Sequence, residues 1–299
     1  MTCVPWPGHG AAVRTPCWPG SLTRLPAAIC PPTDVTSSRC ADRWSRRSTC
    51  STPCRNQAMV DVLVFGPHPD DIEICAGGLV LTLVERGYTV GGVDLTGGES
   101  GTRGDAHTRH AEGQRGAELL GLSFRECLGL ADGGIRNDEP SRDLVIDVIR
   151  RHTPRLVVAP VAIDHHPDHS RSGVLVKEAR FLAGCARIGP PGAPHRPGRT
   201  LFYPSRELVE PSLIVDISDV FDAKLRAVRA HASQLHAAGS DELPTMIASE
   251  GFLTMIEARA RHYGAQIGVT HGEPFVVDGP LAVNDPVPAV RDGPQSVFL

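Results

Sequence analysis

The chain has 299 residues, of which 41% are hydrophobic and 21% charged, and its formal net charge is -4 at pH 7. These values are typical of a globular protein that is long enough for one large α/β domain. The slightly acidic balance argues against a general nucleic-acid binder, and no apolar run approaches the roughly 20 residues of a membrane span. We therefore expect a partner that is neither a nucleic acid nor a membrane.

Residues 1–58 differ in composition from the rest of the chain. They hold six of the nine Cys, all three Trp, seven Arg and only two Asp. They contain no CxxC pair and no helical or alternating periodicity. We expect a disordered extension, or the product of a start codon set too early with Met59 as the natural start; a disulfide or zinc module is the alternative. The remaining Cys are scattered, as in a reduced cytoplasmic protein.

From residue 60 onward, apolar runs alternate with helical patterns. Residues 60–65 predict a buried strand, 72–86 a helix and 89–95 a second strand, a βαβ unit whose crossover should be right-handed. The tail from His271 is expected to be irregular. Further strands are expected at residues 124–128, 155–160, 201–204 and 213–216, and further helices at 107–120, 144–151, 170–182, 219–237 and 245–264.

This alternation predicts the fold class. We expect residues 59–299 to form a single α/β domain with a doubly wound, mostly parallel sheet of Rossmann-like topology. The GxGxxG fingerprint is missing after the first strand and GxxxxGK[ST] occurs nowhere, so neither a dinucleotide site nor an ATP site is indicated.

Two groups of His and Asp follow two of the predicted parallel strands. His68, Asp70 and Asp71 come directly after the first strand, and residues 165–169 (HHPDH) follow the strand at 155–160. The carboxyl ends of parallel strands are where open α/β sheets bind ligands. Because His and Asp are ligands of divalent metals such as zinc, we expect a metal-dependent hydrolase.

The spacing of these residues suggests their roles. Hydrolytic zinc sites use three protein ligands and keep one position for water. His68 and Asp71 are three residues apart on one tight loop, and His169 can complete a His-Asp-His set. The metal would lower the pKa of bound water toward ~7 and polarise a carbonyl. Asp70, next to a ligand but pointing elsewhere, would then act as the general base.

Two further residues of the second group fit supporting roles. His166 could donate a hydrogen bond to the oxyanion that forms, and Asp168 could orient His166 by accepting from its other nitrogen. Taken alone, residues 68–71 could be only a turn with a helix N-cap, and residues 165–169 only a solvated loop. Two such groups at equivalent strand ends favour a metal site.

These stretches resemble a known family. GPHPDDIEICAGG (66–78) and HHPDH (165–169) resemble the signatures of the zinc-dependent N-acetylglucosaminyl deacetylases, the LmbE-like or PIG-L superfamily. DLTGGESGTRG (94–104) and FLTMIEARARHYGAQIGVTHGEPF (252–275) are similar to the subgroup that deacetylates N-acetylglucosaminyl-malate in bacillithiol synthesis. The resemblance runs from Val60 to about Val287.

The resemblance implies that His68, Asp71 and His169 bind the metal and that Asp70 acts as both acid and base. It also implies that His166 is the electrophilic partner and that Asp168 modulates His166. It implies one zinc ion per chain, although ferrous iron or cobalt would also suit mixed N/O ligands. The implied reaction removes the N-acetyl group from an amino-sugar conjugate and releases acetate. The family also implies a homo-oligomer, whereas the cytoplasmic location is expected from the cysteine usage.

Substrate contacts are expected from four side chains. Arg109 and Arg196 match family arginines and could bind the malate carboxylates, and Glu99 and Arg103 lie on a Gly-rich loop facing the pocket. Alternatively, Arg109 is a surface helix charge paired with Glu112.

The sequence departs from the family pattern at two positions, of which His165 bears on substrate preference. His165 stands where the subgroup often has Arg, and Cys75 stands where Gly is common. Two alternatives to the malate conjugate stay open. One is another N-acetylglucosamine compound (an inositol conjugate, the free sugar or chitobiose). The other is a metal-binding protein without catalysis, which would not need Asp70.

Overall fold

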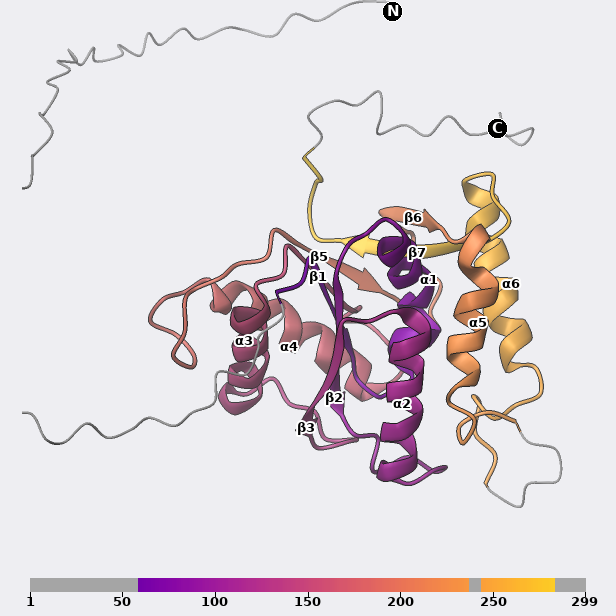
Figure 1. The fold of residues 1–299 in the computed structure, drawn as a ribbon, viewed down its shortest axis with the longest axis horizontal. Coiled ribbons are helices and arrows are strands. Elements are labelled where there is room, and N and C mark those ends of the chain that lie inside the picture. The colour runs from indigo at the N-terminus through magenta and orange to yellow at the C-terminus, as the bar shows by residue number, and fades with distance from the viewer. Residues whose placement is uncertain (1–58, 237–242, 283–299) are drawn as a thin grey trace, which may run out of the picture. The chain divides into compact units, whose positions relative to one another are not determined.

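The computed structural model describes residues 59–236 and 243–282 (Figure 1). The predicted extension, residues 1–58, lies outside the described residues. Within the described ranges, no helix is long and apolar enough to cross a lipid bilayer.

A seven-stranded sheet has the order β3-β2-β1-β4-β5-β7-β6. Its parallel strands are β1 (Val62–Gly66), β2 (Val90–Thr96), β3 (Phe124–Leu130), β4 (Leu156–Pro160) and β5 (Arg199–Tyr203). The antiparallel strands β7 (Gly272–Val277) and β6 (Leu213–Asp216) extend the sheet beyond β5. The predicted doubly wound, mostly parallel α/β fold is confirmed.

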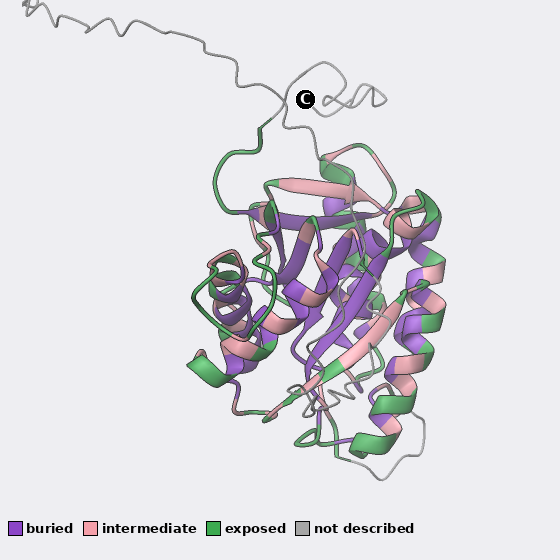
Figure 2. Ribbon diagram, turned by 60° about the vertical axis from the view of Figure 1, so that its left-hand side comes forward, coloured by how far each residue is buried: buried purple, intermediate pink, exposed green. Residues whose placement is uncertain are grey.

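Helices cover both faces of this sheet. Helices α3 (Glu139–His152) and α4 (Pro167–Ala183) pack on one face (Figure 1). Helices α1 (Asp71–Glu85), α2 (Ala106–Leu120), α5 (Phe221–Arg229) and α6 (Phe252–Gln266), with the short 3-10 helix η1 (Ser218–Val220), lie on the other. The central strands β1, β2 and β4 are buried in the middle layer, whereas the edge strands β3 and β6 are only partly buried. The outer faces of the helices are exposed (Figure 2).

The sequence of β1 shows why this strand is central. Successive side chains of a strand point to opposite faces, so Val62 and Val64 join the core under α1, whereas Leu63 and Phe65 join the core under α3 and α4. Full burial of such a side chain contributes roughly 1.5–3 kcal/mol. A run that is apolar at every position is therefore typical of a strand covered on both faces.

The C-terminal part of the chain differs from the predictions. The helix expected at 219–237 ends at Arg229, and residues 231–236 turn inward, where Gln234 Nε2 donates to the carbonyl of Arg103 at 2.6 Å. These tertiary contacts override the helical periodicity. The helix expected from residue 245 begins at Phe252. The prediction of an irregular tail from His271 was wrong, because residues 272–277 form β7.

Candidate active site

The two His/Asp groups lie at the carboxyl ends of β1 and β4. These strands are parallel neighbours, with Val62 opposite Leu156, so both ends open on the same edge of the sheet. The strand order reverses between them, which is the point where open α/β sheets bind ligands. The loop after β1 leads straight into α1 at Asp71, and the loop after β4 leads into α4 at Pro167. Proline suits this first helical position because its missing N–H would have no helical partner.

The predicted ligand set is brought together by this arrangement. Asp71 lies between the two imidazoles, with Oδ2 3.1 Å from His68 Nδ1 and Oδ1 3.2 Å from His169 Nε2. One ligand atom of each of the three residues lies within 4.8 Å of the others. All three side chains are buried. Three ligand atoms at this separation can contact a single ion.

Two further carboxylates support the histidines. Asp132 Oδ1 is 3.2 Å from His68 Nε2, and Asp164 Oδ2 is 3.7 Å from His169 Nδ1. Carboxylates placed behind metal-binding imidazoles orient the rings and raise their basicity. Sequence reasoning missed both residues, since a single Asp in a loop has no periodicity or spacing signal. Their positions just beyond β3 and β4 were the available clue.

The surrounding carboxylates stabilise positive charge on both imidazoles. Burial lowers the pKa of His68, but hydrogen bonds to three Asp side chains outweigh burial and raise it to about 12. Burial also lowers the pKa of His169, but the charge of Asp71 and hydrogen bonds to Asp164 and Asp71 raise it to about 10. An environment so favourable to positive charge, with two imidazoles and a carboxylate, fits a divalent cation such as Zn²⁺.

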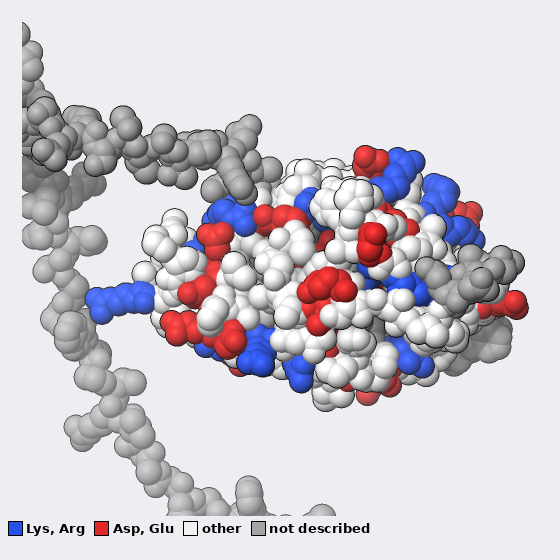
Figure 3. Space-filling model, turned by 90° about the horizontal axis from the view of Figure 1, so that it is seen from below, with Lys and Arg blue, Asp and Glu red and all other residues white. Residues whose placement is uncertain are grey.

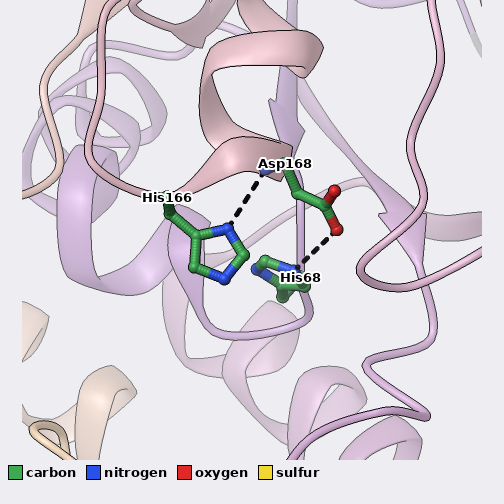
Figure 4. Close-up of side chains that lie close together, drawn as sticks. All are labelled: His68, His166 and Asp168. Carbon is green, nitrogen blue, oxygen red and sulfur yellow. Dashed lines mark hydrogen bonds and ion pairs between the residues drawn. The ribbon is translucent and has the colours of Figure 1, made fainter.

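His166, Asp168 and His68 form a second set of possible ligands (Figure 4). The Asp168 carboxylate accepts from the backbone N–H groups of Gly133 at 2.7 Å and Ile135 at 3.3 Å. It also lies 3.6 Å from His68 Nε2. The prediction that the Asp168 side chain orients His166 was wrong, because the carboxylate is held by the loop after β3. The backbone N–H of Asp168 donates to His166 Nδ1 instead, at 3.2 Å.

That backbone hydrogen bond has a chemical consequence for His166. A ring nitrogen that accepts a hydrogen bond carries no proton, so the neutral ring has its proton on Nε2. Burial and the positive charges of His68 and His169 lower the pKa of His166, which favours this neutral form. The ring lines the pocket. His166 is therefore arranged to donate a hydrogen bond from Nε2.

Asp70 is held by Arg109. Asp70 Oδ1 lies 3.2 Å from Arg109 Nη2, and Arg109 Nη1 donates to the carbonyl of Gly98 at 2.9 Å. Both side chains are buried. The alternative that pairs Arg109 with Glu112 was wrong, because Glu112 accepts from the N–H and hydroxyl of Ser233 at 2.7 Å each.

A pocket of about 430 Å³ connects these side chains. Its wall includes Asp70, Asp132 and His166, and it extends to residues 100–102 and 245–247. The exposed side chain of Arg206 also lines it. The volume is within the range of small-molecule sites.

Glu99 and Arg103 do not line this pocket. Glu99 accepts from the N–H of Asp132 at 2.9 Å and so holds the loop after β3. Arg103 donates to the backbone carbonyls of Ser233 at 3.1 Å and Leu235 at 3.4 Å. The prediction that Arg103 faces the pocket was wrong, since its side chain ties the Gly-rich loop to residues 233–235.

Arg196 lies at the opposite end of α4 from the candidate site. Its Nε donates to the carbonyl of Phe181 at 3.2 Å, and its guanidinium lies 4.2 Å from the centre of the Phe181 ring. Phe181 is twelve residues beyond His169 on the same helix, roughly 18 Å at 1.5 Å per residue. Within one chain, the structure does not bring Arg196 to the pocket, contrary to the prediction.

Comparison with known proteins supports a relationship over most of the described chain. The family model PIG-L, GlcNAc-PI de-N-acetylase, matches residues 63–180, which include both His/Asp groups. Diacetylchitobiose deacetylase of Thermococcus kodakarensis is 34% identical over 188 residues, covering 58% of this chain and 69% of that protein. A probable N-acetyl-alpha-D-glucosaminyl L-malate deacetylase 2 of Bacillus cereus is 31% identical over 193 residues, covering 59% and 84%.

A solved structure also supports this relationship. The conserved protein TT1542 from Thermus thermophilus superposes with a TM-score of 0.69 at 36% identity, covering 78% of this chain and 100% of that chain. The relatives also include a 4-oxalmesaconate hydratase of Pseudomonas putida, 29% identical over 212 residues, covering 63% of this chain and 82% of that protein. The chain belongs to the PIG-L family, whose model describes a GlcNAc-PI de-N-acetylase.

Proposed function

We propose that the protein is a metal-dependent N-deacetylase of an N-acetylglucosamine conjugate. The observation that carries the proposal is the grouping of His68, Asp71 and His169 around one point, with Asp70 and His166 in the same pocket. The relatives named as deacetylases support the reaction class.

The first three residues would hold the divalent cation. When bound, such an ion polarises an amide carbonyl and lowers the pKa of water. Zinc fits this donor set, and Fe²⁺ or Co²⁺ would also be accepted by its mixed N/O ligands.

The other residues would move protons and stabilise charge. The Asp70 carboxylate takes a proton from the attacking water, whose oxygen bonds to the amide carbon. His166 Nε2–H donates to the oxygen that becomes negative. The C–N bond then breaks, and Asp70 returns the proton to the leaving nitrogen, which gives acetate and a free amine.

We further propose N-acetylglucosaminyl-malate, a bacillithiol precursor, as the substrate. The resemblance of residues 94–104 and 252–275 to that subgroup supports it, as does the name of the Bacillus cereus relative. Arg206 replaces Arg196 as the proposed partner of a malate carboxylate, because its exposed side chain lines the pocket. Arg109 is already engaged by Asp70.

Diacetylchitobiose is the second candidate substrate. It is favoured by the 34% identity to the Thermococcus kodakarensis enzyme. Either substrate is a small molecule. On the face in Figure 3, acidic and basic side chains are interspersed. A homo-oligomeric state stays a prediction from the resemblance, and a cytoplasmic location stays a prediction from the cysteine usage.

Acetate release by the metal-loaded full chain tests these proposals. The substrates are N-acetylglucosaminyl-malate, its inositol counterpart, N-acetylglucosamine and diacetylchitobiose. A kcat/KM at least about tenfold higher for the malate conjugate supports the assignment, and activity on neutral sugars alone contradicts it. If no substrate releases acetate, the deacetylase proposal is wrong, and hydration of an unsaturated acid should then be assayed because of the hydratase relative.

A further inference from the structure

Arg125 forms a buried ion cluster beneath the loop that carries Asp70. Its Nε and Nη2 donate to the Asp94 carboxylate at 2.7 and 2.9 Å, and its Nη1 donates to Glu73 Oε1 at 2.5 Å. The side chain is 1% exposed. The three residues come from β3, β2 and α1, so the cluster joins elements that are far apart in the sequence.

The same guanidinium also binds the loop before α1. Nη2 donates to the carbonyl of Pro69, and Nη1 donates to the carbonyl of Gly113 at 2.8 Å. The Pro69 carbonyl belongs to the peptide group that joins Pro69 to Asp70. Gly113 lies on α2, the helix that also carries Arg109. Asp70 is therefore held at two points, its backbone by Arg125 and its carboxylate by Arg109.

A role in stability alone explains this cluster poorly. Removing charges from water is costly, and apolar residues of similar volume often replace a buried ion pair without loss of stability. Carbonyl binding by a rigid guanidinium, in contrast, fixes the peptide plane before Asp70. An error of about 1 Å in the position of a reacting group can reduce the rate by roughly 100-fold.

We propose that Arg125 is a positioning residue for Asp70, fixing the Pro69–Asp70 peptide so that the carboxylate faces the pocket. The inference rests on the proposed role of Asp70 as proton acceptor. Glu73 and Asp94 hold the guanidinium in the orientation that this contact needs.

Arg125→Lys tests the proposal, because lysine keeps the charge but cannot bind Glu73, Asp94 and Pro69 together. We expect kcat to fall roughly 10- to 100-fold, with KM and metal content within about twofold of the wild type. Arg150→Lys is the matched control. Arg150 is also buried and also donates to backbone carbonyls, including that of Ala183 at 3.0 Å, but it lies on α3. The Arg150→Lys variant should be less stable than the wild type but keep its kcat.

A second variant tests the proposal if Arg125→Lys does not fold. Arg125→Met combined with Glu73→Gln and Asp94→Asn removes all three charges, so Pro69 loses its donor and no carboxylate of the cluster is left buried without its partner. A folded variant of either kind with unchanged kcat overturns the proposal. Crystal structures of the variants report the position of Asp70 without any activity measurement. If Asp70 has not moved in these structures, the positioning proposal is wrong, whether or not the wild type is active. An inactive wild type would refute only the proposed deacetylase function.

Discussion

Replacing Asp70 with Asn removes the proposed proton acceptor and keeps nearly the same shape. Asp70 Oδ1 lies 3.2 Å from Arg109 Nη2, and an amide oxygen at that position can still accept the hydrogen bond. General acid–base catalysis contributes roughly 10²- to 10⁴-fold. Because the proposed mechanism uses Asp70 in both proton transfers, we expect kcat to fall about 1000-fold, equivalent to about 4 kcal/mol in activation free energy.

The assay is acetate release at saturating substrate, with bound metal measured on the same sample. Asp70 is in neither group of possible ligands, so metal content should stay at the wild-type level. Asp71→Asn is the matched comparison, and it should lose metal as well as activity. A kcat within tenfold of the wild type, or a loss of metal from the Asp70 variant, would refute the reasoning.

Four further outcomes are expected. His169→Ala should lower metal content, and an unchanged content removes it from the ligand set. His166→Ala should lower kcat about 10²- to 10³-fold with metal retained; an effect on KM alone contradicts oxyanion binding. Arg206→Ala should raise KM about tenfold for the malate conjugate and leave neutral sugars unaffected, whereas equal effects on both count against a carboxylate contact. Burial raises the pKa of Glu126, but hydrogen bonds and ion pairs to α3 outweigh burial and lower it below 4.5. Glu126→Gln should therefore cost about 1 kcal/mol of unfolding free energy at pH 7. In denaturant titrations this difference should shrink as the pH falls through 4.5 and below; a difference that persists in acid contradicts the assignment.

The central strands and the candidate ligand set could be predicted because their signals are local. Apolar runs such as residues 62–65 must be buried on both faces, and short His/Asp motifs follow them directly. Once β1 and β4 pair in parallel, the loops that follow them bring His68 and His169 close together.

Other features depend on tertiary contacts that the sequence does not show. Strand β7 contains Gly272 and Pro274, which weaken the strand pattern, and it is stabilised by pairing with β5 and β6. The orientation of the Arg196 side chain depends on how its loop packs against the end of α4. Arg125 looked like an ordinary strand residue, because its partners Glu73 and Asp94 are 52 and 31 residues away.

The position of the proposed ligand set at the junction of β1 and β4 would link metal binding to folding. His68 and His169 are about a hundred residues apart in the chain, so an unfolded chain holds no assembled three-ligand site. An ion that binds only the native state adds about 2.7 kcal/mol of stability at a free concentration of 100 Kd. The melting temperature should therefore rise with free metal concentration, and the size of that rise would measure the affinity of the site without any substrate.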